Sequence, residues 1–173
     1  RGATAKVAVI SSGLMGSLSG SAVANTATTG TFTIPLMRSA GFKREHAAGV
    51  EAAASSGGAL VPPIMGAGAY MMLEIVDPPV TYLQIIAAAV VPAVLYYASL
   101  LLIVHLQSVE QTAGAAASDD LPLAKPAGLL FATAFAILIL FLILGFTPFR
   151  AVSLSLLAVL IQAALHPDTR IRA

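Results

Sequence analysis

Two kinds of apolar segment follow each other along the chain: broken ones first, continuous ones later. The continuous run 83–105 has 23 residues and the run 127–146 has 20, and neither contains Asp, Glu, Lys or Arg. At about 1.5 Å per residue, each is long enough to cross the ~30 Å hydrocarbon core of a bilayer. A third run, 151–165, is shorter and would span only with help from its flanks. This part of the chain therefore predicts about three transmembrane helices, the first of them kinked at Pro92.

The first broken segment covers residues 5–37 and is rich in Gly, Ser and Thr. Its middle, GSLSGS at 16–21, disfavours a straight helix, because Gly costs about 1 kcal/mol per site and Ser competes for backbone hydrogen bonds. We expect a helical hairpin with one arm at 7–17, about 16 Å long, a turn around 19–21 and a return arm at 22–37. Such arms reach about halfway across a bilayer. Irregular backbone at that depth must be buried in protein or line a cavity.

The second broken segment, 47–76, would be about 45 Å long as one helix, which is too long for a simple span. It is interrupted at 55–58 (SSGG) and again at Pro62-Pro63. We expect a discontinuous helix made of the pieces 47–54 and 64–75. Its break should lie near mid-membrane and face the tip of the hairpin.

Composition supports lipid as the solvent. Charged residues make up 10% of the chain, hydrophobic residues 58%, and mean hydropathy is +0.90, whereas soluble domains carry roughly 25% charged residues. The predicted fold class is all-α: a polytopic membrane protein with a re-entrant helical hairpin, a discontinuous helix and about three further transmembrane helices. The net charge of +1 gives no indication of nucleic-acid binding, and the absence of Cys excludes disulfides and thiolate metal sites. We expect no cofactor.

Charge placement gives a topology. If the loop 38–46 is cytoplasmic and 74–81 is outside, eight of the nine Lys and Arg residues fall inside and only Arg150 falls outside, as the positive-inside rule expects. The corresponding organisation has four parts. They are a hairpin plus broken helix at 1–76, a transmembrane helix at 77–106, a cytoplasmic connector at 107–126, and transmembrane helices with a polar tail at 127–173. We expect the first part to form half of an ion- and substrate-binding site, for reasons given below.

The broken segments also carry the candidate chemistry. Carbonyls at half-helix C-termini, with Ser and Thr hydroxyls, can replace the water shell of Na⁺, and half-helix N-termini attract a carboxylate. Small residues let two breaks approach closely, although the same residues are common at ordinary helix interfaces. The hairpin candidates are Ser17, Ser19, Gly20, Ser21, Asn25 and Thr29. The candidates in the helix break are Ser55, Ser56, Gly57, Gly58, Pro62 and Pro63.

Glu51 is the most unusual single residue, because an ionised acid inside a membrane segment is costly. One interpretation is a proton-binding or coupling carboxylate, or the partner of a buried Arg. The other is a side chain near the cytoplasmic boundary that snorkels or pairs with Lys43 or Arg44.

Two motifs in these segments resemble a known family. GSLSGSAVANTATTGTFTIPLM and AGVEAAASSGGALVPPIMGAGAYMM are similar to the large membrane subunit of TRAP transporters, in the fused form associated with TAXI-type substrate-binding proteins. The resemblance implies secondary active uptake of carboxylate-bearing solutes across a bacterial or archaeal cytoplasmic membrane, by an elevator movement coupled to an ion gradient, commonly Na⁺. It also implies a delivering extracytoplasmic binding protein. Ser19, Gly20, Ser21, Asn25 and Thr29 would then be hairpin-tip residues, and Ser55–Gly58 with Pro62 and Pro63 the helix break.

The family has two inverted repeats, and this chain shows one hairpin with one broken helix. We therefore expect the chain to be the C-terminal part of a permease, with the remaining N-terminal part as a partner. Two other functions stay open at this stage: a passive channel, and a membrane assembly protein that does not transport. An intramembrane enzyme is weaker, since no Ser-His, di-Asp or metal pattern lies at membrane depth, and we expect no enzymatic activity.

Overall fold

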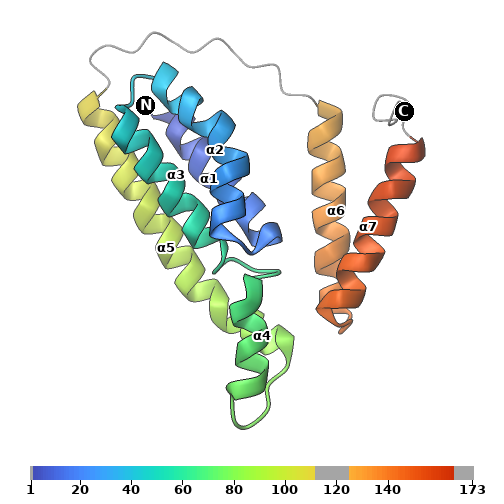
Figure 1. Ribbon diagram of the computed structural model, residues 1–173. Helices are drawn as coiled ribbons and strands as arrows, with labels where there is room; N and C mark the ends of the chain where they lie inside the picture. The colour runs from blue at the N-terminus through green and yellow to red at the C-terminus, as the bar shows by residue number, and fades with distance from the viewer. Residues whose placement is uncertain (1, 112–124, 166–173) are drawn as a thin grey trace. The chain divides into compact units, whose positions relative to one another are not determined.

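The computed structural model describes residues 2–111 and 125–165, and within these ranges the chain is entirely helical apart from its turns and loops (Figure 1). The chain divides into two compact units, Arg1–Asp119 and Asp120–Ala173. Most of the expected connector 107–126 and the polar tail lie outside the described residues. The described residues form the helices α1 (Ala3–Ser19), α2 (Ala22–Ser39), α3 (Arg44–Gly58), α4 (Gly66–Ile75), α5 (Tyr82–Gln111), α6 (Lys125–Ile143) and α7 (Pro148–Leu165).

Helices α1 and α2 form the expected hairpin, with a turn of two residues. Gly20 ends α1 in the left-handed conformation (φ 62°), and its N–H donates to Gly16 O at 2.8 Å. Ser21 caps α2, because its hydroxyl accepts from the N–H of Ala24 at 3.3 Å. A glycine C-cap followed at once by a serine N-cap is a compact way to reverse a chain between helices.

Both arms differ from the sequence expectation in length. Helix α1 has 17 residues and α2 has 18, or about 26 Å each, rather than about 16 Å for the first arm. Helix α1 also continues past Ser17 to Ser19. The Ser17 hydroxyl donates to Leu14 O at 2.7 Å inside its own helix, so this serine does not break the helix.

The expected interruption at 55–58 is wrong in position. Helix α3 begins at Arg44 and continues through Gly58, so Ser55, Ser56, Gly57 and Gly58 form its last turn. The non-helical stretch is 59–65, which contains Pro62 and Pro63, and α4 begins at Gly66 rather than at 64. The two glycines stay helical because they serve packing: a Cβ on Gly58 would lie 2.5 Å from Gly16 Cα, and one on Gly57 would collide with the Tyr96 ring.

Helix α5 is the longest element and contains Pro92. Among the described residues it is the one helix whose length and composition would allow it to cross a membrane, over Tyr82–Ser108. It begins one residue before the expected run and continues past its end. In the second unit the described apolar helices are shorter, Ala132–Ile143 and Pro148–Gln162. Helix α7 starts at Pro148, three residues before the expected start, and proline is favoured at a first helical position.

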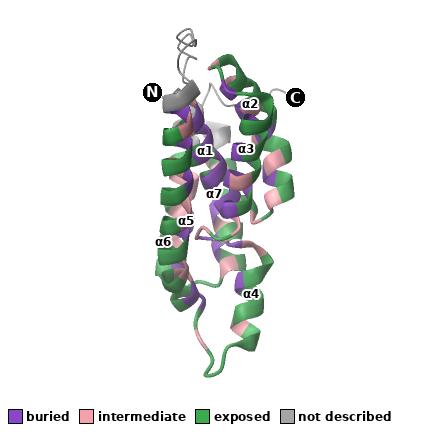
Figure 2. Cartoon of the chain, turned by 90° about the vertical axis from the view of Figure 1, so that its left-hand side faces the viewer, coloured by how far each residue is buried: buried purple, intermediate pink, exposed green. Residues whose placement is uncertain are grey.

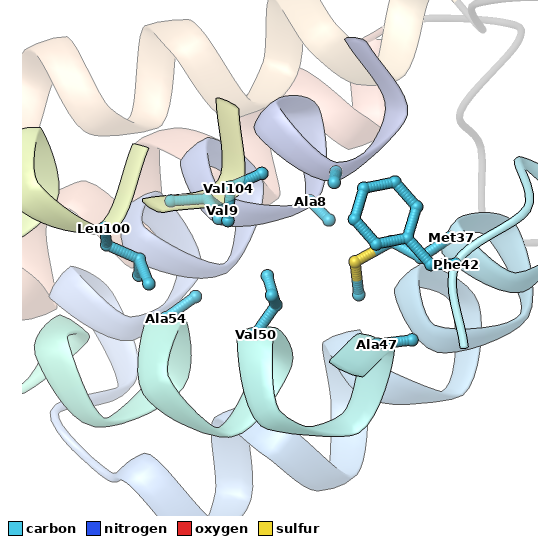
Figure 3. Packing of buried hydrophobic residues seen from close by; sticks show 10 residues of the cluster. Ala8, Val9, Met37, Phe42, Ala47, Val50, Ala54, Leu100 and Val104 are labelled. Atoms are coloured by element: carbon cyan, nitrogen blue, oxygen red, sulfur yellow. The ribbon is translucent and has the colours of Figure 1, made fainter. Parts of the chain in front are cut away.

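Small side chains let α1, α3 and α5 pack closely in the first unit. Figure 3 shows Val9, Val50 and Val104 facing one another, with the small residues Ala8 and Ala54 beside them. Burial is uneven: Figure 2 shows α4 mostly exposed, and Ala69 is its one buried residue. The core therefore holds the hairpin against α3 and α5.

Helices α1 and α5 run antiparallel, and three contacts give their register. Gly2 lies against Ser108, Lys6 Nζ is 2.9 Å from His105 Nδ1, and Gly13 lies against the Tyr97 ring. Continued to the tip, this register brings Gly20 level with about position 90, roughly 10 Å inside the apolar run that starts at residue 83. The hairpin tip thus ends within the apolar length of α5, not at its edge.

In the second unit, α6 and α7 form a separate helical hairpin. The hydroxyl of Thr133 donates to Gln162 Oε1 at 2.8 Å, and that of Ser155 donates to Ala134 O at 3.1 Å. The turn between the helices passes through Gly145 with φ 81°. Polar groups on these apolar helices are thus paired across their shared interface.

The contact between Gly16 and Gly58 predicts a stability difference between two alanine substitutions in α3. Gly58→Ala places a methyl group against the α1 backbone, so it should destabilise the protein by about 1–3 kcal/mol. Gly49→Ala is the matched control, because a Cβ there meets nothing within 4 Å and alanine favours a helix by up to about 1 kcal/mol. Unfolding of the purified permease in detergent measures both, and equal effects would contradict the close approach of α1 and α3.

Candidate functional site

The tip of the hairpin and the break after α3 lie in direct contact. A Cβ on Gly20 would be 2.6 Å from Gly66 Cα, and one on Gly66 would strike Gly20 O. Both residues have positive φ, 62° and 60°, so each needs glycine for its conformation as well as for space. The N–H of Ile64 also donates to Ser17 O at 3.2 Å. The sequence expectation that the two irregular stretches face each other agrees with this geometry.

Four helix ends meet at this contact. Helices α1 and α3 end there, at Ser19 and Gly58, while α2 and α4 begin there, at Ala22 and Gly66. Helix C-termini present carbonyl oxygens with partial negative charge, and helix N-termini present amides with partial positive charge. The same small region can therefore attract a cation and an anion to neighbouring places.

Tyrosines of α5 hold the carbonyls of the broken helix. The Tyr82 hydroxyl lies 2.8 Å from both Pro63 O and Ile64 O. The hydroxyls of Tyr96 and Tyr97 donate to Ala53 O at 2.9 Å and Ala54 O at 2.6 Å. Ala53 O and Ala54 O also accept helical N–H groups within α3, so both of their lone pairs are used. Pro63 O and Ile64 O each keep a second lone pair, so the carbonyls of the break can accept from Tyr82 and still face a cation.

Glu51 is enclosed by hydroxyl groups from three helices. The hydroxyl of Ser12 is 2.9 Å from each carboxylate oxygen, and that of Ser55 is 3.0 Å from Oε1. Thr29 donates to Oε1 at 2.5 Å and Thr33 to Oε2 at 2.6 Å. We call Glu51 and these four residues the Glu51 cage. It joins both arms of the hairpin to α3.

The burial of Glu51 rules out one of the two sequence interpretations. Its side chain is 0% exposed, so it does not snorkel. Lys43 and Arg44 are exposed at the start of α3. Within the described part of the chain no Lys, Arg or His forms an ion pair with the carboxylate, whose partners are the four hydroxyls.

Asn25 adjoins the Glu51 cage and carries an unpaired acceptor. It is 0% exposed, and its Nδ2 donates to Ser12 O at 2.7 Å and to Ser55 Oγ at 3.1 Å. The bond to a main-chain carbonyl fixes which end of the amide is nitrogen. Its Oδ1 is buried and has no hydrogen-bond partner among the described residues. A buried acceptor without a donor is costly, and a cation would relieve that cost.

The sequence-predicted site residues separate into groups. Thr29 and Ser55 belong to the Glu51 cage, with Asn25 beside it. Ser17, Gly20 and Pro63 lie at the contact between tip and break. Ser19, Ser21 and Ser56 are exposed and do not reach the cage, since Ser56 donates to Ala52 O. Gly57 and Gly58 serve helix packing, and Pro62 is half-buried in the break.

Sequence reasoning missed Ser12, Thr33 and Tyr82. A weak signal existed for Thr33, because it follows Thr29 by four residues and so lies on the same helix face. Ser12 and Tyr82 had no such signal, because their roles depend on how α1 and α5 pack against the broken helix.

A separate pocket of about 410 Å³ lies between α4 and α5, lined by residues such as Met65, Ala69, Met72, Ile85 and Pro92. Gln84 is the most polar side chain among its lining residues, and none of them is charged. It has nothing to neutralise a carboxylate or a cation, so it is distinct from the site at the helix ends.

Comparison with known families decides what kind of protein contains this site. Residues 1–172 match the family described as "Tripartite ATP-independent periplasmic transporter, DctM component". The chain belongs to this family. No curated protein matches it, and no solved structure matches it.

Membership gives the chain its general function and its place in the cell. It is a membrane permease component of a TRAP transporter, a secondary transporter that works with a periplasmic solute-binding protein. It is a multi-pass protein of the inner membrane and not an enzyme. The surface of α5 is apolar and mostly exposed, which suits contact with lipid.

The bonds from Tyr82 to the break predict a measurable loss of stability. Tyr82→Phe keeps the ring but removes the hydroxyl that Pro63 O and Ile64 O share, and Pro63 O is buried, so the loss should cost about 1–2 kcal/mol. Tyr70→Phe is the control, since Tyr70 stacks on Tyr82 at 5.7 Å and its hydroxyl makes no hydrogen bond within the described residues. Thermal unfolding of the two variants should separate them, and identical midpoints would show that the break does not depend on Tyr82.

Proposed function

We propose that this TRAP permease is of the fused, TAXI-associated type and takes up carboxylate-bearing solutes coupled to a Na⁺ gradient. The observation that carries the proposal is the meeting of two helix C-termini and two helix N-termini at the contact between Gly20 and Gly66. Such an arrangement suits a cation and a carboxylate bound side by side. The two motifs that contain this contact are also the ones that resemble the family.

In this proposal α1 and α2 form a re-entrant hairpin, α3 and α4 form a discontinuous helix, and α5, α6 and α7 cross the membrane. The register between α1 and α5 supports a hairpin tip inside the apolar layer. Irregular backbone at that depth needs protein partners or a lined cavity, and the partners are the glycine contact and the Tyr82 hydroxyl.

The cation would be held by oxygens close to the helix ends. Asn25 Oδ1 is a buried acceptor that could bind it, and the carbonyls of the break add further oxygens. Sodium prefers oxygen ligands, and glycine backbones let it approach them closely. The amides at the starts of α2 and α4 would meet the solute's carboxylate.

Cation and solute transport are coupled if the binding of each depends on the binding of the other. A bound cation neutralises the carbonyl ends and orders the tip, so the carboxylate finds its amides in place. Only the loaded site then moves across the membrane. The partners are the periplasmic binding protein, the rest of the permease and the bilayer.

Transport in liposomes tests the proposal directly. The permease, together with its remaining part, is reconstituted with its solute-binding protein and offered radiolabelled mono- and dicarboxylates, with a Na⁺ gradient, a K⁺ gradient or no gradient. Uptake against a concentration difference that requires inward Na⁺ supports Na⁺-coupled transport. Solute flux that does not depend on the Na⁺ gradient would instead indicate a passive channel. Absence of any flux would favour a role in membrane assembly.

Asn25→Ala tests the cation site in the same assay. Removing Oδ1 should raise the Na⁺ concentration for half-maximal uptake by on the order of tenfold. Thr28→Ala is the control on the same helix, because Thr28 is exposed and, within the described part of the chain, its hydroxyl bonds only to carbonyls of α2. An unchanged Na⁺ requirement in Asn25→Ala would remove this residue from the site.

A further inference from the structure

We propose that Glu51 is a reversible proton-binding site, and that its charge state sets how strongly the adjoining site holds a cation. Only the link between Glu51 and cation binding rests on the proposed function; the proton site itself does not. It starts from a fully buried carboxyl group bound by hydroxyls of α1, α2 and α3.

Among the described residues, no positively charged side chain pairs with Glu51. The groups that face it are Ser12 from α1, Thr29 and Thr33 from α2, and Ser55 from its own helix. From α5 the nearest titratable group is Tyr97, whose hydroxyl donates to Ala54 O. The cation closest to this interface along α1, Lys6, is bonded to His105. A buried carboxyl without a counter-ion can lose or gain a proton, whereas a salt bridge would oppose the gain.

The Glu51 cage can satisfy both forms of the carboxyl group. In the ionised form the four hydroxyls donate to it. A hydroxyl can also accept, so a protonated Glu51 can donate its new O–H to one of them. The threonines then have other acceptors ready: Thr29 Oγ1 is 2.8 Å from Asn25 O, and Thr33 Oγ1 is 3.0 Å from Thr29 O. The exchange moves one proton and rotates hydroxyls, and it needs no other reactant.

The cage also offers a proton-transfer path toward the surface. Thr29 is only half-buried, so the chain of hydroxyls from Glu51 through Thr29 leads toward the surface of this unit.

The proton and the cation would compete through electrostatics. Asn25 Nδ2 donates to Ser55 Oγ, which itself donates to Glu51 Oε1. The unpaired Asn25 Oδ1 is therefore on a side chain two hydrogen bonds from the carboxylate. A negative charge this close favours a cation, and protonation removes that charge. Low pH should therefore weaken cation binding.

Infrared difference spectroscopy tests the proton site without any substrate. The permease in lipid is titrated with acid, and the carbonyl stretch of protonated carboxyls is recorded for wild type, Glu51→Gln and Glu45→Gln. Glu45 is the matched control, an exposed acid on the same helix. A band that is lost in Glu51→Gln and kept in Glu45→Gln is expected. A spectrum unchanged by Glu51→Gln would overturn the proton site.

Thermal stabilisation by NaCl, compared with KCl at equal ionic strength, tests the link to the cation. In wild type the NaCl concentration for half-maximal stabilisation should rise on the order of tenfold from high to low pH. Glu51→Gln should abolish that dependence, and Glu51→Asp should retain it, which also covers the case that Glu51→Gln fails to fold. A wild-type NaCl requirement independent of pH would overturn the link.

Failure of the Glu51 proposal can be distinguished from failure of the proposed sodium-coupled function. If NaCl and KCl act alike at every pH, the sodium part of the proposed function and the link both fail, and the infrared band alone decides the proton site. If NaCl stabilises specifically but no band belongs to Glu51, the sodium site stands and Glu51 is a structural hydrogen-bond acceptor.

Discussion

Backbone groups released at a helix end have no water to bond inside a bilayer, and each unsatisfied one costs several kcal/mol. The first unit is organised by this constraint. Where α1 turns into α2, Gly20 and Ser21 close the two helix ends with capping bonds. Where α3 gives way to α4, Tyr82 supplies its hydroxyl to two carbonyls of the break, and Ile64 donates to Ser17 O. The two irregular stretches therefore supply hydrogen-bond partners for each other's backbone groups, and α5 supplies a further one.

Small residues allow the hairpin tip and the break to come close enough for these backbone hydrogen bonds. Gly16 meets Gly58 and Gly20 meets Gly66 at distances that no Cβ would allow. The same closeness brings Ser12, Thr29 and Thr33 within hydrogen-bonding reach of a carboxylate on α3. Polar chemistry inside this unit is thus a consequence of backbone approach: with larger residues at the glycines, the hydroxyls and Glu51 would be too far apart to bond.

The hairpin and the existence of a broken helix could be predicted from the sequence, because Gly, Ser and Pro in an apolar segment have strong local preferences. The position of the break could not. Ser55–Gly58 look like helix breakers by propensity, but packing against Gly16 and Tyr96 keeps them helical. The candidate site was predicted in part for a similar reason. Asn25, Thr29, Ser55 and Glu51 lie in recognisable motifs, whereas Ser12 and Tyr82 join the site only through the packing of α1 and α5.

The contact between Lys6 and His105 lies at the end of α1 opposite the hairpin tip. Together with Gly13 against Tyr97 and Tyr82 against the break, it attaches α5 to the hairpin and the broken helix along most of its length. A membrane-length helix is thus packed against the elements that carry the candidate site. If the proposed transport cycle moves this region relative to the bilayer, α5 would move with it. Its exposed apolar side would then slide against lipid, and the resistance of that lipid would add to the cost of each transport step.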